Sequence, residues 1–254
     1  MNHQAYEGEL NRNGDTQPTR DELVVERPLQ VVINGEALTV TMQTPGHEAE
    51  LVRGLLHNED IYRGEGLDRK AFQFRASEGN IMDQITLDID SDELGQGYLN
   101  SRQLLSVSSC GICGRASFEG RSGSINGTGK LIDLEEAFNA MRKEQHLFSA
   151  TGGSHGAAAF TDEGEHIVTR EDIGRHNAVD KVIGHLLFEG NLPKAKVLLV
   201  SGRISYEIVS KCFMAGVPNL AAVSAPSSLA VDFAKELGIQ LYGFVRDGRA
   251  TRYA

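Results

Sequence analysis

Two of the three cysteines in this chain of 254 residues, Cys110 and Cys113, share the segment SSCGICGR with flanking glycines. Thiols at this spacing can bind a metal, form a disulfide or carry sulfur. A thiol reacts as its thiolate, and a neighbouring cation such as Arg115 favours that form. The surroundings of the two cysteines must therefore decide among three chemistries.

A structural zinc site normally takes four ligands, and the chain has no second C-x-x-C to complete one. The missing ligands would have to come from His155, His176 or Cys212 elsewhere in the fold. A thioredoxin-like redox pair should open a helix after a strand, whereas the glycines and serines here predict a loop. We therefore expect no metal site, although metal binding stays an alternative.

The signature of zinc nucleoside deaminases is also missing. His155 is followed by Gly156-Ala157, so no glutamate stands where the general acid/base would be. Ser109, not proline, precedes Cys110. Hydrolytic deamination is disfavoured even for a related scaffold.

Composition and charge narrow the class of protein. Acidic side chains outnumber basic ones, 35 to 25, which disfavours nucleic acid as a partner. The first 21 residues resemble no signal peptide, and no stretch approaches the roughly 20 apolar residues of a membrane span. We expect a cytoplasmic protein without membrane contact, in which three cysteines do not make a disulfide scaffold.

The chain divides into three predicted parts: a disordered tail over residues 1–22, an α+β portion over 23–130 that includes the C-x-x-C loop, and an α/β domain over 131–254. Alternating apolar residues around Asn34-Gly35 predict an opening hairpin over 28–42. Thr44 and Pro45 are expected to cap and begin the helix that follows.

The last 60 residues predict a β-α-β-α-β unit, with strands over 196–200, 220–223 and 240–245. Right-handed crossovers would make these strands parallel, and ligands of open α/β sheets bind beyond their carboxyl ends. The residues there offer hydroxyls, guanidinium groups and exposed amides, which suit a phosphate. They are Ser201, Arg203, Ser224, Arg246, Asp247, Gly248 and Arg249.

Alternatives stay open for single residues of this edge. Ser201, Ser224 and Ser227 can each be a helix cap rather than a ligand. The dense polar segment over 170–177 holds Arg175 and His176, which a capping role does not explain. His155 follows Gly152-Gly153 and is either a ligand of the site or a structural histidine.

Six motifs in order are similar to those of the formate dehydrogenase accessory proteins, the FdhD family of sulfurtransferases. They are SSCGICG at 108–114, TGGSHGAAAF at 151–160, REDIGRHNAVDKVIG at 170–184, LLVSGRISYEIV at 198–209, LAAVSAPSSLAV at 220–231 and YGFVRDGR at 242–249. The resemblance runs from about Val31 to Tyr253.

The resemblance implies a cytidine-deaminase-like α/β fold with a smaller N-terminal portion, and a cytoplasmic homodimer. It implies transfer of sulfur from a cysteine desulfurase to the molybdenum cofactor, bis-molybdopterin guanine dinucleotide, for formate dehydrogenase. Cys110 matches the persulfide cysteine, with Cys113 beside it as a relay. The stretch Phe244, Val245, Arg246, Asp247, Gly248 and Arg249 matches the cofactor-binding segment, and a free guanine nucleotide would mimic the cofactor.

Two other functions compete with this interpretation. A chaperone would hold the molybdenum cofactor without handling sulfur, and His155, Arg175 and His176 would then line its site. A zinc-dependent hydrolase on a deaminase-like scaffold would need stoichiometric metal at Cys110 and Cys113.

Overall fold

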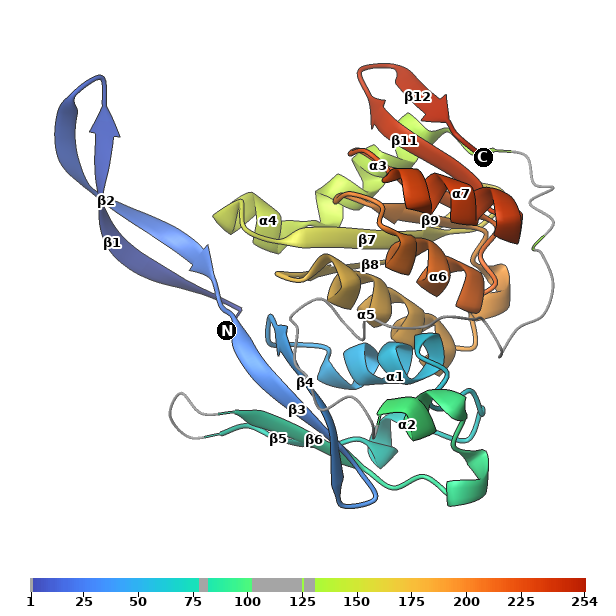
Figure 1. Cartoon of the computed structure of the whole chain (residues 1–254). Coiled ribbons are helices and arrows are strands. Elements are labelled where there is room, and N and C mark those ends of the chain that lie inside the picture. Colours follow the sequence, from blue (N-terminus) through green and yellow to red (C-terminus); the bar gives the residue numbers. More distant parts are fainter. Residues whose placement is uncertain (1, 78–81, 102–124, 126–130) are drawn as a thin grey trace.

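The computed structural model describes residues 2–77, 82–101, 125 and 131–254 (Figure 1). The described part is a mixed α/β protein with three sheets, which confirms the α/β class. Cys110, Cys113 and the strand predicted at 104–107 lie outside the described residues.

The elements follow one another along the chain with short connections. The strands are β1 (His3–Arg12), β2 (Asp15–Val24), β3 (Arg27–Ile33), β4 (Glu36–Gln43), β5 (Gln73–Arg75), β6 (Asp83–Leu87), β7 (His155–Phe160), β8 (His166–Asp172), β9 (Val197–Val200), β10 (Asn219–Ala222), β11 (Gln240–Arg246) and β12 (Arg249–Arg252). The α-helices are α1 (Glu48–Asn58), α2 (Gln96–Ser101), α3 (Leu134–Glu144), α4 (His146–Thr151), α5 (Arg175–Phe188), α6 (Tyr206–Met214) and α7 (Ser228–Leu237).

The main sheet has six strands in the order β12-β11-β10-β9-β7-β8. Strands β9, β10 and β11 are parallel, as predicted, while β7, β8 and β12 join antiparallel. Side chains alternate between two apolar layers because successive strand residues point to opposite faces. Leu198 and Val200 pack with α5, α6 and α7, whereas Val197 and Leu199 pack with α3 on the other face.

The smaller sheet, in the order β4-β3-β6-β5, packs its apolar face against α1. Helix α1 in turn lies along α5 (Figure 1). The two helices meet at glycines: a Cβ atom at Gly54 would overlap the carbonyl oxygen of Asp180, and one at Gly184 would overlap that of Glu50. The close approach of these backbones ties the N-terminal sheet to the main sheet.

The disordered tail predicted over residues 1–22 is wrong. Strands β1 and β2 pair along their whole length and project from the body as a hairpin, here called the arm (residues 3–24) (Figure 1). Asn13 and Gly14 form its turn with positive φ angles of 55° and 94°, the conformation that Asn-Gly favours in tight hairpins. The low apolar content of this stretch concealed a turn signal as strong as Asn34-Gly35.

The predicted start of the first helix is also wrong. Helix α1 begins at Glu48 after His47, not at Thr44 and Pro45. Thr44 instead joins β4 to β8: its N–H donates to Asp172 Oδ2 at 3.0 Å, and its hydroxyl accepts from the N–H of Ile173 at 3.1 Å. A long-range partner therefore replaces the local capping role.

The hairpin over 28–42 is confirmed as β3 and β4, and the C-terminal unit is confirmed as β9-α6-β10-α7-β11. The final strand β12 was not predicted; it turns back from β11 at Asp247-Gly248. Within the described residues, the helices are all too short or too polar to cross a membrane.

Candidate functional site

The carboxyl ends of β9, β10 and β11 lie side by side at one edge of the main sheet (Figure 1). Backbone bonds join the loops that leave them. The N–H of Ile204 donates to the carbonyl of Ala225 at 3.1 Å, and the N–H of Phe244 donates to the carbonyl of Ser224 at 3.1 Å. Residues from three separate motifs are thus held in one row.

His155 reaches the same edge at the start of β7, because β7 runs antiparallel to β9. Its ring lies over Gly202: a Cβ atom at that glycine would stand 3.2 Å from His155 Nδ1. Burial lowers the pKa of His155, and the nearby cations Arg175 and Arg203 lower it further. This histidine is therefore neutral at pH 7 in a cationic setting.

Arg175 and His176 belong to the first turn of α5 and face the start of α6. His176 Nε2 lies 3.4 Å from the hydroxyl of Ser205 and 4.0 Å from Glu207 Oε2. Burial, followed by the charges of Lys211 and Arg175, lowers the pKa of His176 to about 4. The contact with Glu207 is therefore not an ion pair at neutral pH.

The Nε–H of Arg175 is buried and has no hydrogen-bond partner among the described residues. Buried donors in native proteins nearly always have a partner. An unused guanidinium donor beside a second cation, Arg203, and above the small Gly202 fits an anionic group such as a phosphate. The cluster of His155, Arg175, His176 and Arg203 is here called the basic edge.

The predicted cofactor segment forms the tip of the β11–β12 hairpin. Arg246, Asp247, Gly248 and Arg249 are exposed, and the Arg249 guanidinium lies 6.0 Å from the centre of the Phe244 ring. Val245 differs from its neighbours, because its side chain is buried in the apolar layer under α3. Its side chain packs the sheet and does not face a ligand.

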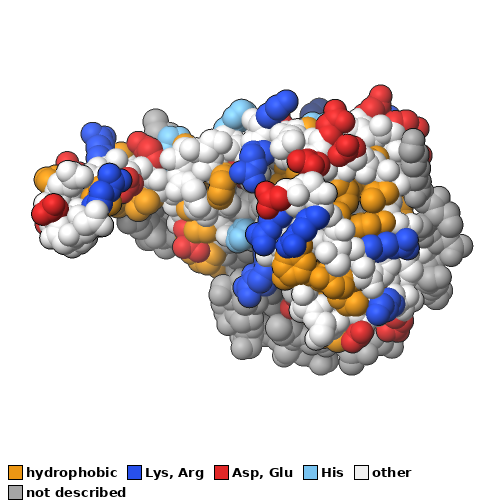
Figure 2. Space-filling model, turned by 90° about the horizontal axis from the view of Figure 1, so that it is seen from above, with side chains coloured by type: hydrophobic (Ala, Val, Ile, Leu, Met, Phe, Trp, Pro, Cys, Tyr) orange, Lys and Arg blue, Asp and Glu red, His pale blue; other side chains and the backbone are white. Residues whose placement is uncertain are grey.

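Arg246 and Arg249 share no hydrogen bond or ion pair with the basic edge within the described part of the chain. Seen from above, Lys and Arg side chains nevertheless gather around a histidine in the middle of the molecule, next to apolar side chains (Figure 2). The overall acidic chain thus has a local positive surface on this face.

The serines of this edge have different roles. The Ser201 hydroxyl accepts from the N–H of Gly156 at 2.9 Å, which fastens β9 to β7. Ser227 caps α7 by accepting from the N–H of Ala230 at 3.2 Å. Ser224 contributes its carbonyl to Phe244, and its role towards a ligand stays a prediction.

Sequence reasoning missed Ser205, Glu207 and Lys211, which surround His176. Ser205 occupies the N-cap position of α6 and Glu207 lies in its first turn, a pattern that marks a helix start. Lys211 gave no signal, because a lysine inside a helix is usually exposed.

Cys212 is confirmed as a buried core thiol. It is completely buried, donates to the carbonyl of Val217 at 3.2 Å, and has a pKa raised by burial. In the described parts of the chain, no three His, Cys, Asp or Glu side chains are placed to hold a metal ion.

The sequence model of the FdhD/NarQ family matches residues 24–254. The chain belongs to the FdhD/NarQ family. The match begins where the arm ends and covers the basic edge, the β11–β12 hairpin and both C-x-x-C cysteines.

Curated relatives of this FdhD/NarQ chain carry the name sulfur carrier protein FdhD. The protein of Mycolicibacterium paratuberculosis is 44% identical over 247 residues, covering 91% of this chain and 89% of its own length. That of Sulfolobus acidocaldarius is 39% identical over 247 residues, covering 95% and 92%.

A solved structure from Desulfotalea psychrophila, described as a candidate formate dehydrogenase accessory protein, has the same fold. Its TM-score is 0.74 over 99% of this chain and 96% of the other, at 20% identity. This similarity supports the arrangement of the sheets described above.

Proposed function

We propose that this chain is a sulfur carrier that serves the maturation of formate dehydrogenase. It would accept sulfur from a cysteine desulfurase on Cys110 and deliver it to bis-molybdopterin guanine dinucleotide. The observation that carries the proposal is the C-x-x-C pair within a chain that shares about 40% identity with named sulfur carriers over nearly its full length.

The loading step exchanges one thiol for another without an outside oxidant. The Cys110 thiolate attacks the outer sulfur of the desulfurase persulfide, a new S–S bond forms, and the desulfurase cysteine leaves as a thiolate. Arg115 favours the anionic form of Cys110 before the attack and of the persulfide after it.

Delivery as sulfide needs two electrons, which the cysteine pair can supply. The Cys113 thiolate attacks the inner sulfur of the Cys110 persulfide, a Cys110–Cys113 disulfide forms, and hydrosulfide leaves for the molybdenum substrate. The disulfide must then be reduced by a cellular thiol before another cycle. Direct relay of the outer sulfur to Cys113 is the other route.

The basic edge suits the anionic part of the substrate. The unused Nε–H of Arg175 and the guanidinium of Arg203 would bind phosphate, and the neutral rings of His155 and His176 would accept or donate hydrogen bonds. Arg246 and Arg249 would reach the same ligand from the hairpin. A guanine nucleotide alone, such as GDP, would occupy part of this site.

We further propose a cytoplasmic homodimer and a cytidine-deaminase-like arrangement of the six-stranded sheet. Superposing β7, β9, β10 and β11 on a solved cytidine deaminase tests the arrangement. Sedimentation of the purified chain tests the dimer.

Sulfur loading measured by mass spectrometry of the intact protein tests the function. Incubation with a cysteine desulfurase and cysteine should add one sulfur atom to the parent and none to Cys110→Ala. Cys212→Ala is the matched control, since a completely buried thiol cannot be loaded, and it should load like the parent.

Two results would contradict the sulfur carrier. Absence of added sulfur together with tight GDP binding would favour a cofactor chaperone. One equivalent of zinc, lost in both Cys110→Ala and Cys113→Ala, would favour a metal-dependent hydrolase.

A further inference from the structure

The arm is a two-stranded sheet that leaves the body at Val25 and is mostly exposed on both faces. Only its base packs on the body, where Val24 meets Gly153. An isolated hairpin is marginally stable in water at best, and stable sheets have more strands or a covered face. Ten paired residues on each strand therefore indicate that another surface covers the arm.

The arm has one apolar face. Even-numbered residues of β1 share a face with their partners on β2, and Leu23 pairs with Gln4 in this register. Tyr6, Leu10 and Leu23 are 53%, 37% and 46% exposed, and all three lie on that face. The opposite face carries Glu7, Glu9, Arg20 and Glu22. Water covers the second face well and the first poorly.

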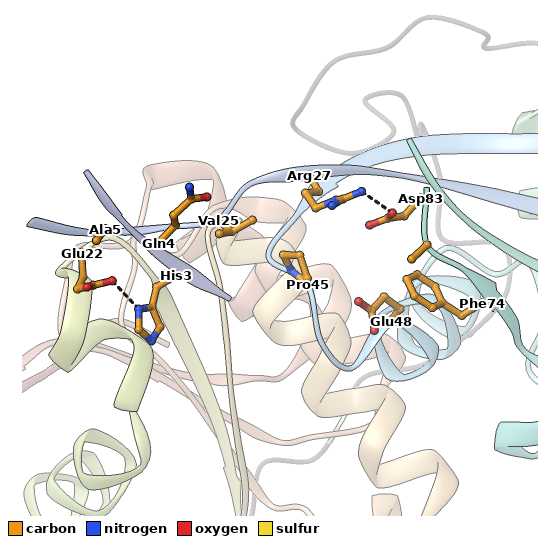
Figure 3. Close-up of a pocket in the computed structure, with 11 residues that line it drawn as sticks. His3, Gln4, Ala5, Glu22, Val25, Arg27, Pro45, Glu48, Phe74 and Asp83 are labelled. Atoms are coloured by element: carbon orange, nitrogen blue, oxygen red, sulfur yellow. Dashed lines mark hydrogen bonds and ion pairs between the residues drawn. The ribbon is translucent and has the colours of Figure 1, made fainter. Parts of the chain in front are cut away.

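A hollow of about 620 Å³ lies at the base of the arm, between β1 and the small sheet (Figure 3). Ala5, Val25, Pro45, Phe74 and Ala76 give it an apolar lining. Phe74 is 46% exposed there.

The charged groups of the hollow are mostly paired with one another. Arg27 pairs with Asp83 at 2.8 Å, and His3 pairs with Glu22 at 2.9 Å. Glu48 accepts only a backbone N–H, that of Gly46, among the described residues. An apolar side chain accompanied by a cation would fit this lining.

We propose that two copies of this chain exchange arms, so that the tip of each arm fills the hollow at the base of the partner's arm. A twofold interface uses the same surface on both copies. Two arms that lie antiparallel about a twofold axis bring each tip to the other's base. Leu10 and Arg12 stand at the tip, and the apolar lining with Glu48 stands at the base.

This inference goes beyond the proposed dimer by naming its surface, and it does not depend on sulfur transfer. The family match begins at residue 24, so the arm lies outside the shared region that contains the cysteines. A failure of sulfur loading would leave the arm exchange standing, and the reverse also holds.

Sedimentation of matched variants tests the apolar contact. Leu10→Asp should weaken the dimer by about tenfold or more, because it places a charge in an apolar lining. Asn11→Asp adds the same charge one residue later, on the opposite face, and should leave the dissociation constant within about twofold. Equal effects of the two variants, or a parent that sediments as a monomer, would overturn the proposal.

A charge swap tests the pairing of Arg12 with Glu48. Arg12→Glu and Glu48→Arg should each weaken the dimer, and the double variant should recover most of the loss. Thermal unfolding of the Glu48 variant at low concentration separates damage to α1 from damage to the interface. Losses that simply add in the double variant would count against this pairing.

A photo-crosslinking residue in place of Leu10 identifies the occupant of the hollow directly. Mixed isotope-labelled and unlabelled chains should give crosslinks between copies, at residues 74–76 or near Pro45. Crosslinks within one chain, or to a different protein, would refute exchange between two copies.

Discussion

The ammonium of Lys211 on α6 donates hydrogen bonds to both carboxylate oxygens of Asp180 on α5, at 2.9 and 3.0 Å. Both side chains are buried, and Asn58 of α1 donates to the same carboxylate. Burial alone would lower the pKa of Lys211, but the carboxylates of Asp180 and Glu59 raise it. The lysine stays charged, joins three helices and faces His176.

Removing the cation should unfold the protein more easily. Lys211→Met leaves the Asp180 carboxylate buried without its partner, which we expect to lower the free energy of unfolding by about 3 to 5 kcal/mol. Urea denaturation measures the loss. The double variant Lys211→Met with Asp180→Asn removes both charges and should lose clearly less; an equal loss would mean that packing, not charge, is responsible.

His176 should titrate far below an ordinary histidine. Its pKa is lowered to about 4 by burial, Lys211 and Arg175, so an NMR titration of the imidazole signals should find the neutral ring down to about pH 5. Lys211→Met should raise this pKa towards 6.5. An unchanged midpoint in that variant would remove the lysine from the electrostatics of the basic edge.

The same histidine gives stability a defined pH dependence. Between pH 6.5 and about 4 the unfolded chain binds a proton at His176 that the folded chain does not. Lowering the pH through this window therefore reduces stability, by up to about 3 kcal/mol for this group. The difference between the parent and His176→Gln in urea denaturation at several pH values isolates the contribution, because other titrating groups cancel.

The contact between α1 and α5 depends on the absence of a side chain at Gly184. Gly184→Ala would push a Cβ atom onto the Glu50 carbonyl, so the helices must separate, and we expect a loss of about 1 to 3 kcal/mol. Gly8→Ala is the matched control, because its Cβ atom would meet only Thr19 at an ordinary 3.7 Å. Similar thermal shifts for both variants would contradict the close approach.

Local patterns were sufficient to predict the core of the fold. Alternation and helical spacing gave β9, α6, β10, α7 and β11 in register with the structure, because each of these elements buries a regular apolar face. The start of α1 failed, since Thr44 is used by Asp172, which lies 128 positions away. A sequence pattern carries no information on such a partner.

The candidate site was predicted in its row of strand ends and only partly in its contacts. His155, Arg175 and His176 were named from motif density, and the structure places them together because β7 and α5 both meet the end of β9. Val245 was named from the resemblance, but the strand alternation turns it into the core. Lys211 acts on His176 across two helices, which no local pattern could indicate.

Binding of GDP separates the two groups of arginines at the site. Arg175→Gln should weaken GDP binding by about tenfold, because it removes a charged donor to phosphate, whereas Arg20→Gln on the polar face of the arm should have no effect. Calorimetry at two salt concentrations measures both. If one nucleotide bridges the basic edge and the β11–β12 hairpin, the losses from Arg175→Gln and Arg246→Gln should both appear, because each removes a separate contact to the same phosphates. An effect of Arg246→Gln without one of Arg175→Gln would move the phosphate site to the hairpin alone, and would leave the buried Nε–H of Arg175 to be explained by a different partner.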